Sequence, residues 1–294
     1  MLQFMVYFVI MDDKNDEPAG PLGIENWDEC CRVWSQVPKL VASIGGNGSD
    51  GSNGDQISNS SSSIGSQVPA VEPYVSQIEP TFTDIYRSFT SQQWRRFVDN
   101  WLDYGSGNVE QNAYNGRWFS SVDQLLKNRR KTAGVIPTTI TLDYAYKFEL
   151  PERDWLDPRM QTLIQLATDQ IILVNDLFSF EKELMANIGQ LPVTTTTGTG
   201  SDDADRQVLP QMANTVAITA VQRNCPIVEA QTVIIDTIEQ LESEIIKLVI
   251  DWETGGRQSL PLSTGARQFI NGLLYMAGGN YMFSIGCDRY NKFK

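Results

Sequence analysis

The sequence predicts an all-α protein, and three observations support this fold class. The longer apolar segments repeat with the three-to-four-residue spacing of amphipathic helices. Alternating patterns that would indicate strands are weak, and the best of them covers residues 135–142. The chain has 294 residues, of which 41% are hydrophobic, so it can bury one substantial core. We therefore expect a single helical domain over residues 1–294.

Helical periodicity recurs along most of the chain. In 228–252, for example, Ile234, Ile238, Leu241 and Ile245 fall on one broad apolar stripe. The segments with this pattern are 81–104, 122–131, 160–188, 208–223, 228–252 and 266–283. Each is expected to bury its apolar face against the others.

Stretches of low apolar content separate these helices. Residues 43–69 are rich in Gly, Ser and Asn, and residues 194–205 have the same character. Such segments bury too little apolar surface to offset the entropy of ordering, so we expect loops there. Residues 255–265 are a third predicted loop.

The first eleven residues are apolar on nearly every side. They lack a basic leader and a small-residue cleavage site, and they are too short to span a bilayer. A helix that is apolar all round belongs in a protein interior. We therefore expect no membrane insertion, and a chain that begins within a core.

Composition excludes several functional classes. The formal charge of −13 disfavours binding to nucleic acid or to anionic membranes. The absence of histidine excludes Ser-His-Asp and Cys-His catalysis and zinc sites built on imidazole. The four cysteines show no CxxC spacing and are interpreted as reduced thiols, which suits a cytoplasmic protein: Cys30, Cys31, Cys225 and Cys287.

The segment 175–183, with the sequence NDLFSFEKE, carries the strongest chemical signal. In a helix, residues four apart advance by about 40°, so Asn175, Ser179 and Glu183 lie within roughly 80° of one another. Their amide, hydroxyl and carboxylate oxygens are ligands that Mg²⁺ prefers. The alternative is an ordinary polar helix face. The preceding apolar run 171–174 favours a site, because polar groups on a buried helix need partners or metal.

Three further segments hold candidate residues. Residues 12–17 contain a DDxxD pattern, in which Asp12 and Asp16 are one helical turn apart and can share metal ions; an exposed acidic helix end is the simpler explanation. Residues 128–134 are basic and end at a glycine, about 45 residues before Asn175, and could be a solvated patch. Residues 288–290 place an arginine and a tyrosine near the end of the chain, where they could simply close the last helix.

NDLFSFEKE matches the NDxxSxxKE form of the second metal-binding motif of class I terpene synthases. The resemblance implies that Asn175, Ser179 and Glu183 ligate one Mg²⁺ and that Lys182 contacts a diphosphate. Residues 12–16 resemble the family's aspartate-rich motif, which would hold two more Mg²⁺ through Asp12 and Asp16, with Asp13 as the weaker alternative.

The basic and C-terminal segments fit the same family. Arg130 and Gly134 resemble its RxxxG element, in which the arginine senses the diphosphate and the glycine ends a broken helix whose carbonyl faces the substrate. Arg129 is the alternative sensor if the register differs by one residue, and Ala133 stands where a small or acidic residue is usual. Arg289 and Tyr290 resemble the RY pair that hydrogen-bonds the diphosphate.

The resemblance, to microbial, amoebal or fungal sesquiterpene synthases, implies a helical bundle around a central active-site cavity. It implies release of diphosphate from a prenyl diphosphate, with farnesyl diphosphate as the preferred substrate, and cyclisation or elimination of the resulting carbocation to a terpene. The cavity wall could include Tyr7, Phe8, Phe178 and Phe283, although core packing also accounts for each of them. Phe283 stands where the family often carries Trp.

Other functions remain open at this point. An isoprenyl diphosphate synthase shares the fold and metal chemistry but normally has two aspartate-rich motifs, which NDLFSFEKE is not. A catalytically impaired relative or a non-enzymatic helical protein is the second alternative, because only eleven residues precede Asp12 where the family has several helices. We expect the chain as written to be a partial gene model or a shortened relative, N-terminally incomplete, with its site chemistry intact.

Overall fold

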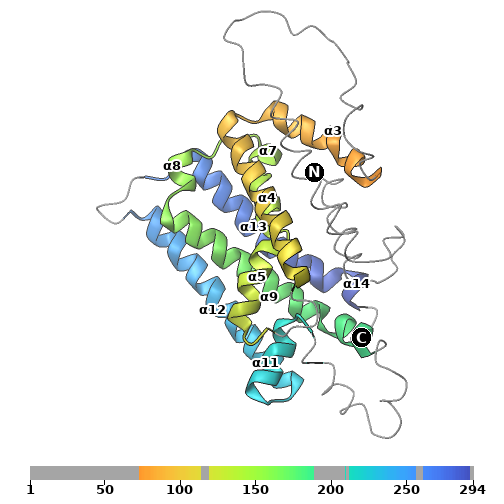
Figure 1. Cartoon of the computed structure of the whole chain (residues 1–294). Helices are drawn as coiled ribbons and strands as arrows, with labels where there is room; N and C mark the ends of the chain where they lie inside the picture. The colour runs from red at the N-terminus through yellow and green to blue at the C-terminus, as the bar shows by residue number, and fades with distance from the viewer. Residues whose placement is uncertain (1–72, 114–118, 189–208, 210–211, 256–260, 292–294) are drawn as a thin grey trace, which may run out of the picture. The chain divides into compact units, whose positions relative to one another are not determined.

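A computed structural model describes residues 73–113, 119–188, 209, 212–255 and 261–291 (Figure 1). These residues form helices and connecting turns, and no strand occurs among them. The chain divides into two compact units, Met1–Asn112 and Ala113–Lys294. The all-α prediction is confirmed for the part of the chain that the structure covers, whereas the expectation of one domain stays a prediction.

The described part of the first unit is a pair of helices, α3 (Pro73–Ser88) and α4 (Ser91–Ala113). The single helix expected over 81–104 is therefore wrong. Thr90 separates the two helices. Its hydroxyl accepts from the backbone N–H of Gln93, and the side-chain oxygen of Gln93 accepts from the backbone N–H of Thr90. This reciprocal capping starts a new helix. Phe82 contacts both Phe97 and Trp101 across the pair, with ring centroids 5.4 and 5.2 Å apart.

The second unit is built around one long helix, α9 (Pro158–Ile188), which packs against α5, α11, α12 and α13. The short helices α6, α7 and α8 lie between α5 and α9 along the chain (Figure 1). The remaining elements are α5 (Val122–Thr132), α6 (Val135–Ile140), α7 (Leu142–Tyr146), α8 (Glu152–Trp155), α11 (Thr215–Arg223), α12 (Ile227–Glu253), α13 (Thr264–Gly286) and α14 (Asp288–Asn291). The predicted helices 122–131, 160–188 and 228–252 agree with α5, α9 and α12 within two residues.

The start predicted for the helix 208–223 is wrong, and the start predicted for the helix 266–283 is two residues late. The helix expected over 208–223 begins only at Thr215, because the Asn214 side chain accepts from the Val216 N–H and caps α11. Helix α13 begins at Thr264, because Ser263 caps it in the same way through the Ala266 N–H. Gly265, which was expected in a loop, therefore lies in the first turn of α13. The predicted loops 43–69 and 194–205 lie outside the described residues.

The segment 135–142, which had the strongest strand-like pattern, is helical. Gly134 adopts a left-handed conformation with φ of 69° and breaks the chain direction between α5 and α6. Thr138 and Thr139 then donate their hydroxyls to the carbonyl oxygens four residues earlier, at 2.8 Å each. These bonds satisfy the two threonine hydroxyls inside the helix, where Val135, Pro137, Thr139 and Ile140 are buried.

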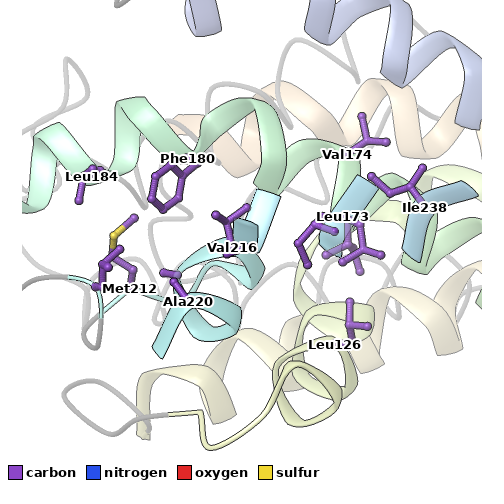
Figure 2. Close-up of a cluster of buried hydrophobic side chains, with 14 residues drawn as sticks. Leu126, Leu173, Val174, Phe180, Leu184, Met212, Val216, Ala220 and Ile238 are labelled. Atoms are coloured by element: carbon purple, nitrogen blue, oxygen red, sulfur yellow. The ribbon is translucent and has the colours of Figure 1, made fainter. Parts of the chain in front are cut away.

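Helix α9 joins two hydrophobic clusters. Its C-terminal half, with Leu173 and Phe180, packs against α11, α12 and Leu126 of α5 (Figure 2). Its N-terminal half, with Met160 and Leu163, packs against α13 and Trp252 at the end of α12. Leu177, Phe178 and Phe180 of the segment 175–183 pack in the first of these clusters, so its packing holds the segment in place. None of the described helices is long and apolar enough to cross a membrane.

Gly265 gives a test of the packing between α13 and the turn before α8. A Cβ at this position would overlap the backbone carbonyl oxygen of Glu149. We expect Gly265→Ala to lower the free energy of unfolding by about 1–3 kcal/mol or more, because a backbone atom cannot move aside easily. Urea denaturation followed by circular dichroism measures the change.

The control is Gly278→Ala in the same helix, where a Cβ would meet nothing within 4 Å. This substitution should raise the free energy of unfolding by about 0.5–1 kcal/mol, because alanine has the better helix propensity. Equal effects of the two substitutions would contradict the close approach at Gly265.

Candidate metal and diphosphate site

Helix α9 brings Asn175, Ser179 and Glu183 onto one face, as the sequence predicts. The helix is continuous through this segment, and the apolar residues 171–174 before it are buried. Ser179 is 4% exposed and donates its hydroxyl to Glu183 Oε1 at 2.5 Å. The hydroxyl and the carboxylate thus form one oxygen-rich surface, with the amide of Asn175 one turn before it.

Asn175 is the point where three distant segments meet. Its Oδ1 accepts from Arg129 Nη2 of α5 at 3.3 Å, and its Nδ2 donates to the Tyr290 hydroxyl of α14 at 2.8 Å. Tyr290 is 4% exposed, so its hydroxyl is held in place by the surrounding chain. The basic segment, the NDLFSFEKE segment and the C-terminal segment are therefore one site in space.

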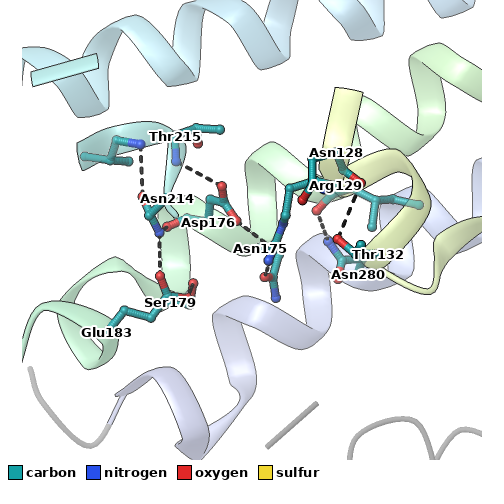
Figure 3. A network of polar contacts seen from close by, with 12 residues as sticks. Asn128, Arg129, Thr132, Asn175, Asp176, Ser179, Glu183, Asn214, Thr215 and Asn280 are labelled. Atoms are coloured by element: carbon teal, nitrogen blue, oxygen red, sulfur yellow. Dashed lines mark hydrogen bonds and ion pairs between the residues drawn. The ribbon is translucent and has the colours of Figure 1, made fainter. Parts of the chain in front are cut away.

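Asp176 connects the helices that form this site. The side chain is 1% exposed, and its Oδ1 lies 2.9 Å from Arg129 Nη2 in an ion pair. Its Oδ2 accepts from the backbone N–H of Thr215 at 3.0 Å, at the start of α11 (Figure 3). Both carboxylate oxygens are thereby used in joining α5, α9 and α11. Asp176 is a structural residue of the motif.

Asn214 connects the start of α11 to the same face of α9. Its Nδ2 donates to the Asp176 carbonyl oxygen and to Glu183 Oε2, each at 2.9 Å. Sequence reasoning missed Asn214, since it placed the helix start at 208. The signal was present, because an asparagine directly before the apolar run 215–218 is typical of a helix N-cap.

The electrostatics of the face favour a bound cation. The pKa of Glu183 is raised above its ordinary value, first because the carboxyl group is buried and second because the charge of Asp176 lies nearby. Hydrogen bonds from Ser179 and Asn214 and the charge of Arg129 act in the opposite direction but do not compensate. A divalent cation at this carboxylate would favour its ionised form.

The donor set fits Mg²⁺ in chemical type. An amide oxygen, a hydroxyl and a carboxylate are hard oxygen ligands with no thiolate or imidazole among them. Within the described ranges, no three or more Asp, Glu, Cys or His side chains gather in a way that could hold a metal ion. Further carboxylates would have to come from elsewhere, and the candidates Asp12, Asp13 and Asp16 lie outside the described residues.

Arg130, the predicted diphosphate sensor, faces a different partner. Its Nε and Nη2 donate to the two carboxylate oxygens of Asp169 at 2.7 and 2.6 Å. This paired hydrogen bonding raises the pKa of the Arg130 guanidinium above its ordinary value. Arg130, from α5, also lines a pocket of about 320 Å³. The other lining residues come from α6 and α9: Ile136, Gln161, Thr162, Ile164, Gln165 and Thr168. Arg129, the alternative in the neighbouring register, is the arginine that contacts NDLFSFEKE.

The helix break expected at Gly134 is present between α5 and α6. The Gly134 carbonyl oxygen accepts from the backbone N–H of Thr138 at 3.2 Å and from its hydroxyl at 2.8 Å. Both bonds run into α6, so the role of this oxygen toward a substrate stays a prediction. Ala133 ends α5 by donating its N–H to the Arg129 carbonyl oxygen.

The remaining predicted residues are placed as follows. Lys182 is half-buried on α9, directly before Glu183, and Arg289 belongs to α14 although its side chain lies outside the described part. Phe178 is half-buried against the hydrophobic cluster and contacts Tyr281, with ring centroids 6.0 Å apart. Phe283 is 53% exposed on α13. Tyr7 and Phe8 are outside the described residues.

The ion pair of Asp176 and Arg129 yields a stability prediction. Asp176→Asn should lower the free energy of unfolding by about 1–3 kcal/mol, because a buried hydrogen-bonded charge loses its partner. A double-mutant cycle with Arg129→Gln should give a coupling energy of about 0.5–3 kcal/mol, as for residues in direct contact. Urea denaturation of the metal-free protein measures all four variants.

The matched control is the exposed pair Glu253 and Arg267, whose closest atoms are 3.4 Å apart. Glu253→Gln should change the free energy of unfolding by about 0–1 kcal/mol, because solvent screens the pair. A coupling energy near zero between Asp176 and Arg129 would show that the two side chains do not form the pair in solution.

A family model described as "Terpene synthase family 2, C-terminal metal binding" matches residues 3–244. Among curated relatives, pentalenene synthase from Streptomyces exfoliatus is 29% identical over 189 residues, which cover 62% of this chain and 47% of the relative. The (1R,4R,5S)-(-)-guaia-6,10(14)-diene synthase from Fusarium proliferatum is 33% identical over 100 residues, which cover 32% of this chain and 25% of the relative. The matched part thus spans about half the length of these relatives, or less.

Solved structures give the same fold. Germacradien-4-ol synthase from Streptomyces citricolor aligns with a TM-score of 0.64 at 21% identity, over 96% of this chain and 75% of that one. Linalool/nerolidol synthase from Streptomyces clavuligerus, in complex with 2-fluorogeranyl diphosphate, aligns with a TM-score of 0.65 at 18% identity, over 95% and 78%. The predicted all-α fold of class I terpene synthases is confirmed. Because the family model covers most of its length, the chain belongs to terpene synthase family 2, the family described by its C-terminal metal binding.

Proposed function

We propose that the protein is a Mg²⁺-dependent terpene synthase that acts on a prenyl diphosphate, with farnesyl diphosphate as the preferred substrate. The observation that carries this proposal is the meeting of Arg129, Asn175 and Tyr290. The Asn175 amide joins a cationic donor, Arg129 Nη2 at 3.3 Å, to a phenol, the Tyr290 hydroxyl at 2.8 Å. Such a group suits a diphosphate that is bridged to the protein by metal ions.

The proposed reaction begins with heterolysis of the allylic C–O bond. The diphosphate leaves with the electron pair, and the carbocation then cyclises, loses a proton or is captured by water. Bound Mg²⁺ would supply Lewis-acid neutralisation of the leaving group. Asn175, Ser179 and Glu183 would hold one ion, and Arg129 and Tyr290 would donate hydrogen bonds to the departing oxygens.

The rest of the predicted site completes this proposal. Asp12 and Asp16 would hold two further Mg²⁺, giving three ions in total. Lys182, Arg130 and Arg289 would add positive charge around the diphosphate, and Arg130 would do so by exchanging Asp169 for the ligand. The break at Gly134 would turn the chain toward the ionising carbon. Phe178 would present an aromatic face that stabilises positive charge while it excludes water.

A cytoplasmic location is part of the same proposal. Cys225 is a free thiol in the structure, and both Cys225 and Cys287 are half-buried. Reduced cysteines are typical of the cytoplasm, where prenyl diphosphate chemistry would need no disulfide support. Oxidation state analysis by mass spectrometry of the protein isolated under alkylating conditions would check the thiols.

The direct test incubates the purified 294-residue protein with Mg²⁺ and geranyl, farnesyl or geranylgeranyl diphosphate. Gas chromatography with mass spectrometry should detect a terpene hydrocarbon or alcohol, most abundantly from farnesyl diphosphate, and chelation of the metal should abolish it. A longer prenyl diphosphate as product would instead identify an isoprenyl diphosphate synthase. Failure with all three substrates, also for an N-terminally extended protein, would overturn the enzyme proposal.

Substitutions on α9 should separate site residues from the rest of the helix surface. Asn175→Ala and Glu183→Gln should each lower kcat by at least about 100-fold, the scale for losing one preorganised polar group at a reacting centre. The control is Glu244→Gln on the exposed surface of α12, which should leave kcat unchanged. Equal activity in Asn175→Ala and the wild type would remove Asn175 from the proposed metal site.

A further inference from the structure

Asn214 is the buried polar residue that contacts a proposed metal ligand without belonging to any of the predicted motifs. It lies 31 residues after Glu183 and is fully buried, with 0% exposure. Its position at the N-cap of α11 explains one of its hydrogen bonds, since Oδ1 accepts from the Val216 N–H at 2.9 Å. The cap does not explain the other two bonds.

The two remaining bonds point at the candidate site. Nδ2 of Asn214 carries two hydrogens, and it donates to the Asp176 carbonyl oxygen and to Glu183 Oε2, each at 2.9 Å (Figure 3). The capping bond fixes which end of the amide faces α9, because Oδ1 must face the Val216 N–H. The amide group is therefore held in the one orientation that gives Glu183 a donor.

A hydrogen-bond partner is important for Glu183 because it fixes the orientation of a flexible side chain. A glutamate side chain loses much rotamer freedom when it is fixed, and this one lies near the C-terminal end of α9. Its Oε1 is held by the Ser179 hydroxyl and its Oε2 by Asn214. Both contacts leave further lone pairs on the carboxylate for a cation, since each carboxylate oxygen can accept more than one bond.

We propose that Asn214 is a positioning residue that orients Glu183 for metal binding, by linking the carboxylate to the start of α11. This inference rests on the proposed function, in which Glu183 is a Mg²⁺ ligand. Outer partners of metal ligands fix the ligand in its binding orientation, and their loss typically weakens metal affinity by about 10–100-fold. The residue would act through Glu183 and would not touch the metal or the substrate.

The test uses variants that keep the helix cap but lack the amide donor. Serine and threonine are both good N-cap residues, so Asn214→Ser and Asn214→Thr should preserve α11. Titration of Mg²⁺ in the presence of inorganic diphosphate, followed by calorimetry, measures the metal affinity of the full chain. Both variants should need about 10–100-fold more Mg²⁺ for half-saturation than the wild type.

A double-mutant cycle with Glu183→Gln distinguishes positioning from a general loss of structure. If Asn214 acts through Glu183, Asn214→Ser should cause little further loss of Mg²⁺ affinity in the Glu183→Gln background. Ser263→Ala is the control, because the hydrogen bond that it removes caps α13 and involves no residue of α9. It should leave Mg²⁺ affinity at the wild-type value.

The outcomes separate this inference from the proposed function. Unchanged Mg²⁺ affinity in both Asn214 variants, together with weakened affinity in Glu183→Gln, would overturn the inference and leave the metal site intact. Full additivity in the cycle would also overturn it, because Asn214 would then act by another route. Absence of saturable Mg²⁺ binding in the wild type would overturn the proposed metal site and the inference together.

Discussion

The site depends on a single buried carboxylate, that of Asp176. Its two oxygens bind the guanidinium of Arg129 on α5 and the first backbone N–H of α11, while its own backbone is part of α9. An ionised group with 1% exposure is stable in a protein interior only with such partners. The partners therefore fix the relative rotation of three helices, and this rotation decides which side chains surround Asn175.

Two neighbouring carboxylates make the oxygen-rich face of α9 electrostatically unfavourable without a bound cation. Asp176 and Glu183 lie close enough that the charge of one raises the pKa of the other, and burial adds to the effect. Hydrogen bonds from Ser179 and Asn214 lessen this cost. Carboxylates with a shifted pKa are typical of functional sites, because a bound cation removes the repulsion between them.

Much of the fold and part of the site could be predicted from local sequence. Helix pitch alone places Asn175, Ser179 and Glu183 on one face, and apolar periodicity locates α5, α9 and α12. The pairing of Arg129 and Arg130 with different aspartates could not be predicted, because it depends on the rotation of α5 against α9. The helical state of 135–142 was missed because its residues alternate as in a strand, whereas the left-handed Gly134 starts a new helix whose apolar residues are buried by the rest of the fold.

The length of α9 has a consequence for how this region can change in evolution. One unbroken helix of 31 residues contributes to both hydrophobic clusters, and the NDLFSFEKE segment lies within the stretch of α9 that packs in the C-terminal one. Substitutions alter such a helix one position at a time, but a single inserted or deleted residue rotates everything beyond it by about 100°. An insertion between Asp169 and Asn175 would turn the oxygen face away from Arg129, Tyr290 and Asn214 at once. Changes of length in this part of α9 should therefore be selected against, whereas substitutions there can be accepted singly.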